Sequence, residues 1–329
     1  MSNFVAEIMG VILSPANKLI DSVSGAIGKA YEPKHVKRMA KAKAKEIELI
    51  GQALRNNADV PIKYEKGEII VDTTDFDEFV KRTQSRIAFQ ELQKQQNIEK
   101  VVDTAYGLLE GETECSEEPV DKDWLSRFFN SVENISDSDM QILWAKILAG
   151  EVKQPKTYSL RTLETLKNLS KDEALLFQKV APYVFCGETN KYITSNANLL
   201  VKYGINYDDI ILLNECGLLT LTSSMGISMN LRKGQDPKEI IYNEKIALIF
   251  DGKNDEDSEI IIRVHKLTTT GKELFDVVKK EPNEEYILDL AETIYIKNKR
   301  NINIRVCKVK CIEKDIVKYE EIPIKEFNE

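Results

Sequence analysis

The sequence has only two histidines, His35 and His265, among its 329 residues. Ser/His/Asp and Cys/His catalytic pairs each require an imidazole, so such a pair would have to use one of these two. Neither histidine lies near a recognisable nucleophile motif. The Gly-x-Gly-x-x-Gly and Gly-x4-Gly-Lys-Ser/Thr patterns that bind nucleotide phosphates are also missing. We therefore predict that the protein is not an enzyme and that it uses no cofactor.

Cysteines are few and scattered, and their number is odd: Cys115, Cys186, Cys216, Cys307 and Cys311. No secretory signal precedes them, so we expect reduced thiols in a cytoplasm. Cys307 and Cys311 are four positions apart on a predicted strand, without the further ligands that zinc needs. Carboxylates two positions apart, such as Asp137 and Asp139, do not share a helix face. We expect packing roles for the two cysteines and no metal site.

Long apolar runs are missing too, because no window approaches the roughly 18 uninterrupted apolar residues of a membrane-spanning helix. The nearest candidate is the start of the chain, where residues 4–13 are apolar apart from Glu7 and residues 19–27 continue with helical spacing. This pattern is typical of a segment on a membrane surface, and equally of one that docks on the protein itself or on a sister subunit. We expect a cytoplasmic protein, with peripheral contact at the inner membrane as an open alternative.

A basic segment follows Pro33. Its six cationic side chains lie among alanines: Lys34, Lys37, Arg38, Lys41, Lys43 and Lys45. The composition favours a helix. The cations could meet phosphates of lipid or nucleic acid, and a solvated helix face is the simpler interpretation. A net charge of −8 argues against attraction of the whole surface to nucleic acid.

The remainder of residues 1–110 predicts an extended N-terminal helical arm. Residues 59–72 indicate a small hairpin or an irregular loop. Residues 75–109 read as one long or broken helix, whose middle at 90–100 is almost entirely polar. A polar middle is typical of a protruding or coiled-coil-like segment rather than a buried one. The acidic stretch at 111–118 is predicted to be a flexible link.

Residues 119–185 predict a central helical domain. Ser136 is a candidate cap for the second helix, and Ser170 with Glu173 forms a capping box for a fourth. The apolar faces must be buried against one another, so both tryptophans should be core anchors. Three runs of apolar residues have helical spacing: Trp124, Leu125, Phe128, Phe129 and Val132; Met140, Leu143, Trp144, Ile147 and Leu148; Leu160, Leu163, Leu166 and Leu169.

The loop between the second and third of these helices is the best polar surface candidate. Lys156, Tyr158 and Arg161 lie in it, and Arg161 follows two hydroxyl-bearing residues at a predicted helix start, where anions are favoured. We predict these three residues as a partner surface. The alternative is a role in helix capping and in hydrogen bonds between helices.

Residues 186–329 predict a mixed α+β domain. Short helices at 196–202 and 207–216 precede a strand at 218–229, β runs at 244–250 and 259–265, and a helix that opens with LTTTGKEL. This order resembles a winged-helix module. The tail at 284–327 adds a helix and two β runs that cap the sheet or extend it.

The second helix of this module separates two functions. It carries Asp208, Asp209 and Glu215 and no lysine or arginine, so it would repel nucleic-acid phosphates. The sequence therefore favours binding of a protein partner. A winged-helix nucleic-acid-binding regulator is the alternative.

Several short motifs also resemble a known family. The segments PVDKDW, FF, SDSDMQ, WAKILAGE and SLRTL between residues 119 and 163, with IG and YEP at 27–33, resemble a bacterial family known only as a numbered domain of unknown function. The resemblance covers about the first 180 residues well. The central helices are more distantly similar to the abortive-infection alpha proteins of phage defence, in which a tryptophan-containing helix ends in a Leu-Ala run before a proline-bearing loop. That similarity implies a defence role and carries no catalytic residues.

Together these patterns predict a mainly α protein with a smaller α+β part: an N-terminal arm over 1–110, a central helical bundle over 119–185 and a winged-helix-like domain over 186–329. We expect a non-enzymatic bacterial interaction protein that forms homo-oligomers through its N-terminal helices. Its partner is expected to be a protein, with a phage protein as one candidate.

Overall fold

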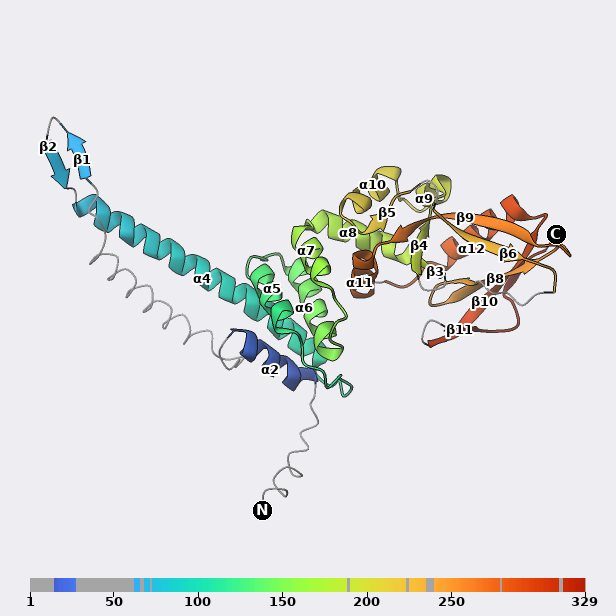
Figure 1. Cartoon of the computed structure of the whole chain (residues 1–329), viewed down its shortest axis with the longest axis horizontal. Helices are drawn as coiled ribbons and strands as arrows, with labels where there is room; N and C mark the ends of the chain where they lie inside the picture. The colour runs from blue at the N-terminus through green and yellow to red at the C-terminus, as the bar shows by residue number, and fades with distance from the viewer. Residues whose placement is uncertain are drawn as a thin grey trace, which may run out of the picture. The chain divides into compact units, whose positions relative to one another are not determined.

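The computed structural model describes residues 15–27, 62–65, 68–71, 73–187, 190–222, 225–234, 240–278, 280–313 and 316–328 (Figure 1). The six predicted cationic contacts at 34–45 and residues 1–14 lie outside the described residues. The chain forms two compact units, Met1–Leu163 and Glu164–Glu329, which we treat separately. The division into three domains stays a prediction.

In the residues of unit 1 that the structure describes, the regular elements are helices and one hairpin. They are α2 (Pro15–Ile27), β1 (Ile62–Glu65), β2 (Glu68–Val71), α4 (Thr73–Leu109), α5 (Lys122–Val132) and α6 (Ser138–Lys153). Ile62 of β1 lies opposite Val71 of β2 in antiparallel register, so the hairpin alternative for this segment is confirmed. α7 (Leu160–Asn168) carries the boundary between the two units.

Aspartates start the two helices that bear the tryptophans. The carboxylate of Asp121 accepts a hydrogen bond from the Trp124 amide at 2.8 Å. Asp137, and not the predicted Ser136, caps α6, because its carboxylate accepts from the amides of Asp139 at 2.9 Å and Met140 at 3.1 Å. A carboxylate in this place satisfies amides that have no partner within the helix, and it also favours the helix dipole.

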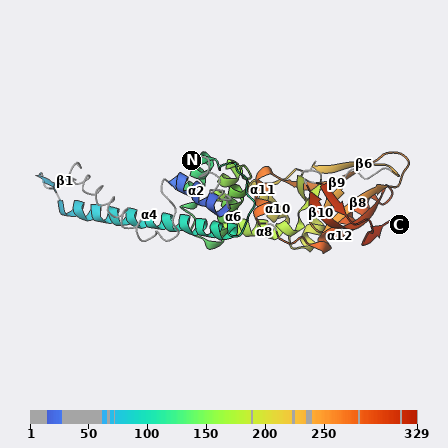
Figure 2. The same ribbon diagram turned by 90° about the horizontal axis from the view of Figure 1, so that it is seen from below.

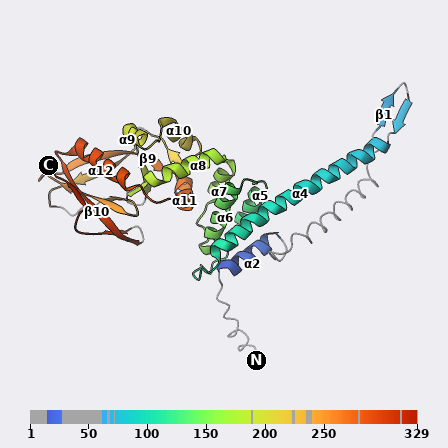
Figure 3. The ribbon, with the colours of Figure 1, turned by 180° about the vertical axis from the view of Figure 1, so that it is seen from behind.

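The aromatic side chains of α5 and α6 form the core of unit 1. Trp124 is 4% exposed and Trp144 is 0% exposed, so the prediction of two core anchors is confirmed. Phe128 lies between them, with ring centroids 5.2 Å from Trp124 and 5.4 Å from Trp144. The helices α2, α4, α5 and α6 pack side by side around this core (Figure 3). None of the described helices has the length and apolar character needed to cross a membrane.

Unit 2 joins helices to a ten-stranded antiparallel sheet, which makes the fold a mixed α+β one. The helices are α8 (Lys171–Val180), α9 (Ala197–Lys202), α10 (Tyr207–Glu215), α11 (Thr269–Val278) and α12 (Glu284–Asn298). The strands are β3 (Phe185–Gly187), β4 (Asn190–Thr194), β5 (Leu219–Thr220), β6 (Gly226–Leu231), β7 (Ile240–Tyr242), β8 (Ile246–Gly252), β9 (Ser258–Leu267), β10 (Ile302–Glu313), β11 (Ile316–Tyr319) and β12 (Lys325–Phe327).

The strand order is β11-β10-β8-β7-β3-β4-β9-β5, with β12 paired to β10 and β6 paired to β9. β10 pairs with β8 from Ile302 opposite Gly252 to Lys308 opposite Ile246, so the tail of the chain extends the sheet rather than only capping it. Apolar residues of α12, including Ile287 and Leu290, pack against one face of the sheet in the main hydrophobic core.

β9 pairs with the two short strands that flank α9 and α10 in the chain, and it leads directly into α11. It lies between β4 and β5, with Ile193 opposite His265 and Leu219 opposite Leu267. The helix predicted from LTTTGKEL is confirmed as α11. Thr268 starts it by donating its amide to the Leu218 carbonyl at 3.0 Å and by accepting from the Gly271 amide at 2.9 Å.

Candidate functional site

The predicted partner loop after α6 is organised by a buried carboxylate. Glu151 is 1% exposed. Its two oxygens accept hydrogen bonds from the main-chain amides of Lys156 at 2.6 Å and Tyr158 at 2.9 Å. Lys156 has a positive φ of 70°, a conformation that non-glycine residues rarely adopt. The buried carboxylate therefore holds the loop in a conformation that its own residues do not favour.

The three predicted contact residues of this loop have different surroundings. Tyr158 is buried, and its ring lies so close to Gly150 that a Cβ there would come within 2.8 Å of it. The ring therefore supports the loop from inside and is not on the surface. Lys156 is exposed and forms an ion pair with Glu118, and Arg161 is exposed at the start of α7. Binding of a partner by Lys156 and Arg161 stays a prediction.

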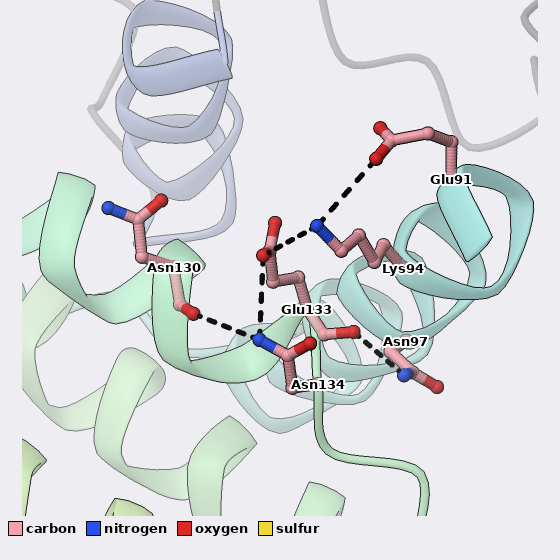
Figure 4. A network of polar contacts seen from close by, with 6 residues as sticks. All are labelled: Glu91, Lys94, Asn97, Asn130, Glu133 and Asn134. Carbon is pink, nitrogen blue, oxygen red and sulfur yellow. Dashed lines mark hydrogen bonds and ion pairs between the residues drawn. The ribbon is translucent and has the colours of Figure 1, made fainter. Parts of the chain in front are cut away.

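A polar network that the sequence did not indicate joins α4 to the turn between α5 and α6 (Figure 4). Asn97 is 3% exposed, and its side-chain amide donates to the Glu133 carbonyl at 2.9 Å. Gln141, which is also buried, donates to the Asn97 side-chain oxygen at 3.3 Å and to the Ile135 carbonyl at 2.7 Å. Two buried amides thus satisfy main-chain groups that the turn leaves without partners.

This network shows that part of the segment at 90–100, predicted to be protruding or coiled-coil-like, contacts the bundle, although only Asn97 of these residues is buried. Lys94 Nζ lies 3.0 Å from Glu133 Oε1 and 3.6 Å from Glu91 Oε1. Its hydrogen bond to Glu133 raises the pKa of Lys94 above the ordinary value, as do the two negative charges. Lys94 and Asn97 contact Glu133 in the turn after α5, and Asn97 also contacts Gln141 of α6, so their polarity does not mark a solvated face. A hydrophobic pattern alone cannot separate a buried polar contact from a solvated face.

In unit 2, α9 and α10 form a surface that is acidic and partly apolar. α9 ends at Lys202. Gly204, two residues further on, has a φ of 74°, and the Ile205 amide donates back to the Leu200 carbonyl at 3.0 Å. α10 buries Ile210 and Leu213. Exposed residues on the two helices are Ala197, Asn198, Val201, Lys202, Tyr207, Asp208 and Glu215. α10 contains no lysine or arginine.

Aromatic rings fix the other side of α9. Tyr203, directly after the helix, donates its hydroxyl to Asp289 of α12, which also accepts from Lys202. The ring of Tyr203 lies 5.3 Å from Tyr183 and 5.4 Å from Tyr286 between centroids. Burial raises the pKa of Tyr203 far above its usual range, and its hydrogen bond to Asp289 adds to this effect. This cluster anchors α9 to α12 and keeps the α9–α10 surface in place.

Three buried or half-buried side chains of unit 2, Cys216, His265 and Cys307, are of residue types that can carry chemistry. Burial raises the pKa of the Cys216 thiol to about 11, with the nearby Glu173 carboxylate adding to the shift, and a raised pKa disfavours the thiolate form. His265 is buried, which lowers its pKa. Cys307 is completely buried in a small apolar cluster with Ile249. In the part of the chain that the structure describes, no three His, Cys, Asp or Glu side chains are grouped to hold a metal ion.

Comparison with known protein families identifies a match over most of the chain. A family model described as "Protein of unknown function (DUF2806)" matches residues 81–291, which include the Glu151 loop, the Asn97 network and the α9–α10 surface. No curated protein and no solved structure matches the chain.

Proposed function

The chain belongs to the DUF2806 family of proteins of unknown function, and from this premise we propose that it is a non-enzymatic interaction protein whose unit 2 binds a protein partner. The observation that carries the proposal is the surface of α10. Tyr207 is 58% exposed and lies beside the exposed carboxylate of Asp208, while Glu215 extends the acidic character to the other end of the helix. Exposed aromatic residues beside charged ones are a feature of protein interfaces.

Strand pairing supports a winged-helix-like arrangement for this part of unit 2. β9 lies between β4 and β5, and α9 and α10 lie between β4 and β5 in the chain. The three strands β6, β7 and β8 are inserted between β5 and β9, and α11 follows β9. In such a module the second helix of the pair, here α10, is the usual reader of a ligand. Its carboxylates disfavour contact with phosphates, which is why a protein partner is preferred over nucleic acid.

Exposed apolar side chains on α4 support self-association through the N-terminal helices. Phe89 is 67% exposed, and Leu92, three positions further on, is also exposed. Residues with this spacing lie on one face of a helix. Apolar surface of this kind is often covered by a partner, and we propose that a second copy of the chain covers it.

The proposed biological setting is phage defence in bacteria. Its support is the distant similarity of the central helices to abortive-infection alpha proteins, in which a tryptophan-containing helix precedes a proline-bearing loop. Trp144 on α6 and Pro155 in the loop after it occupy these places here. A phage protein is the partner that this setting would supply.

Two experiments test the proposal. Plaque counts on bacteria that express the full chain should fall relative to an empty vector. The double variant Asp208→Lys with Glu215→Lys should restore them. Unchanged plaque counts with the wild-type chain would remove the defence role.

Light scattering tests self-association. The wild-type chain should have a mass that is a multiple of the monomer mass, and the double variant Phe89→Glu with Leu92→Glu should have a smaller mass. Ile142→Glu, at another exposed apolar residue of unit 1, is the matched control for the added charge.

Nucleic-acid binding is the alternative function. Fluorescence anisotropy with a labelled DNA duplex measures it directly. Binding that weakens steeply as salt increases, and that the α10 charge reversals strengthen, would favour the regulator over the protein-binding module.

A further inference from the structure

A pocket of about 140 Å³ opens in unit 2 between β6 and the strands β3, β4 and β7. Polar atoms make up more of its accessible wall than apolar ones do, and the apolar part comes from the residues Tyr192, Ile227, Met229, Ile240 and Ile241. Gly187, Gly226 and Ser228 complete the lining. A volume of roughly 150 Å³ accepts a molecule of the size of benzene. The pocket therefore has room for one apolar side chain, such as that of leucine or phenylalanine.

The pocket is lined in part by β6, a strand with one edge that pairs with none of the described strands. β6 pairs with β9 along its whole length, from Gly226 opposite Arg263 to Leu231 opposite Ser258, and none of the described strands pairs with its other edge. Figure 2 labels β6 at the margin of the sheet, beside β9. Edge strands usually carry charge or proline that blocks further pairing.

The sequence of β6, GISMNL, has neither charge nor proline. By contrast, β11 and β12 at the opposite margin of the sheet both carry charged side chains. Ser228 and Asn230 are exposed, so one face of β6 is open to solvent. A six-residue edge that pairs with no other described strand is suited to pairing with an extended chain of another protein.

Charged side chains border the far end of this edge. Arg232 and Lys233 follow β6 directly and are exposed, and the exposed carboxylates of Asp255, Glu256 and Asp257 lie in the neighbouring loop. The Lys233 amide donates to the Asn254 carbonyl at 2.8 Å, which holds this corner in place. Arg232 is four residues beyond Ser228, a distance of about 13 Å along an extended chain. An acidic residue four positions from an apolar anchor would meet this charge.

We propose that β6 binds an extended segment of a partner protein as an added strand, with one apolar side chain in the pocket and an acidic residue beside Arg232 and Lys233. The inference rests on the proposed protein-binding function and specifies the chemistry of the partner. Main-chain hydrogen bonds supply affinity, and the pocket with its basic neighbour supplies selectivity for the segment.

Methyl NMR on the full chain with labelled isoleucine and methionine tests the proposal, because Ile227, Met229, Ile240 and Ile241 report from the pocket wall. The probe is an acetylated nine-residue peptide of alternating threonine and valine, with a central phenylalanine and a glutamate at each end. With a glutamate at both ends, the peptide can place a carboxylate near Arg232 in either the parallel or the antiparallel direction. We expect saturable shifts of these methyl signals. Replacing the phenylalanine by alanine should weaken binding at least tenfold, and replacing both glutamates by lysine several-fold.

Two further variants separate strand addition from simple apolar contact. N-methylation of alternate peptide amides removes main-chain donors without touching the protein, and it should abolish the shifts. Gly187→Leu should fill the pocket, since a Cβ there would lie 3.4 Å from Ile227 Cδ1, an ordinary contact. If that variant does not fold, the peptide variants still decide the result.

Methyl signals that do not move at millimolar peptide, or that move equally with the N-methylated peptide, would overturn the proposal. If the plaque assay still shows protection that depends on α10, such a result would reject the β6 site alone. The opposite result would reject the α10 surface instead. In that case the peptide still binds, and the α10 charge reversals leave phage protection unchanged.

Discussion

The indole nitrogen of Trp124 donates a hydrogen bond to the main-chain carbonyl of Tyr158 at 2.8 Å, across 34 positions of sequence. This bond ties α5 to the loop after α6, the same loop that the Glu151 carboxylate holds from its other side. The second tryptophan, Trp144, is buried without a hydrogen-bond partner for its indole nitrogen among the described residues. The two tryptophans therefore contribute to stability in different ways.

This difference predicts unequal effects of the same substitution. Trp124→Phe and Trp144→Phe remove the same atoms, but only Trp124→Phe leaves a buried carbonyl without its donor. We expect it to lower the free energy of unfolding by about 1–2 kcal/mol more than Trp144→Phe does. Urea unfolding followed by circular dichroism measures both values. Equal losses would mean that the hydrogen bond adds nothing beyond packing.

The Glu151 carboxylate is predicted to hold the loop through both of its oxygens. Glu151→Gln keeps the shape but replaces one acceptor by a donor, so the Lys156 or Tyr158 amide loses its partner. We expect a loss of about 1–3 kcal/mol and faster hydrogen exchange at these two amides. Glu118→Gln removes only the exposed ion pair with Lys156 and should change neither quantity noticeably. Unchanged exchange in Glu151→Gln would assign the loop conformation to other contacts.

Stability of unit 2 should depend on pH through the capping box of α8. The Ser170 amide donates to Glu173 at 2.7 Å, and this hydrogen bond to the main chain, with one from the Ser170 side chain, lowers the pKa of Glu173. A lowered folded-state pKa means that the ionised group stabilises the fold above its unfolded pKa, roughly 4.3. That contribution is lost as the pH falls through the lower, folded-state pKa.

Thermal unfolding from pH 7 to pH 3 measures this effect. The melting temperature of Glu173→Gln should lie below that of the wild type near neutral pH, and the two should converge in acid. Asp172→Asn, at an exposed residue of the same helical turn, is the control for removing a charge there. A gap between wild type and Glu173→Gln that is constant with pH would contradict the assignment.

Gly271 marks a close approach that only glycine permits. A Cβ at this position would lie 2.0 Å from the Leu218 carbonyl oxygen. Gly271→Ala must therefore push α11 away from β5, and we expect a loss of about 2–3 kcal/mol or more. Gly107→Ala, in the interior of α4 with nothing within 4 Å of the new carbon, should stabilise by about 0.5–1 kcal/mol. Calorimetry of the two variants measures both effects, and a tolerated Gly271→Ala would show that α11 can shift freely.

Local chemistry explains what was predictable in the fold. α5, α6, α8 and α11 were expected from apolar spacing and polar caps, which act within four or five residues of the chain. The β runs that became β8 and β9 were visible for the same reason. The α6 cap was placed one residue early, at Ser136 instead of Asp137, because serine and aspartate can both fill that role and only the backbone conformation selects between them.

The candidate sites were less predictable, because their partners are distant in sequence. Nothing local to Glu151 or Asn97 indicates burial, since a charged or amide side chain normally reads as surface. Tyr158 was expected on the surface as part of a polar loop. Its side chain is buried, and its main-chain carbonyl and amide form the hydrogen bonds to Trp124 and Glu151.

By itself the sequence determined the helices, most strands, the acidic character of α10 and the absence of familiar catalytic motifs, because each depends on residue type and short spacing. Only the tertiary structure decided that β10 extends the sheet beside β8, that Asn97 meets Glu133, and that β6 keeps one edge open beside a pocket. Strand order and buried polar contacts depend on which distant segments are brought together, and burial makes those pairings favourable only once the whole unit has folded.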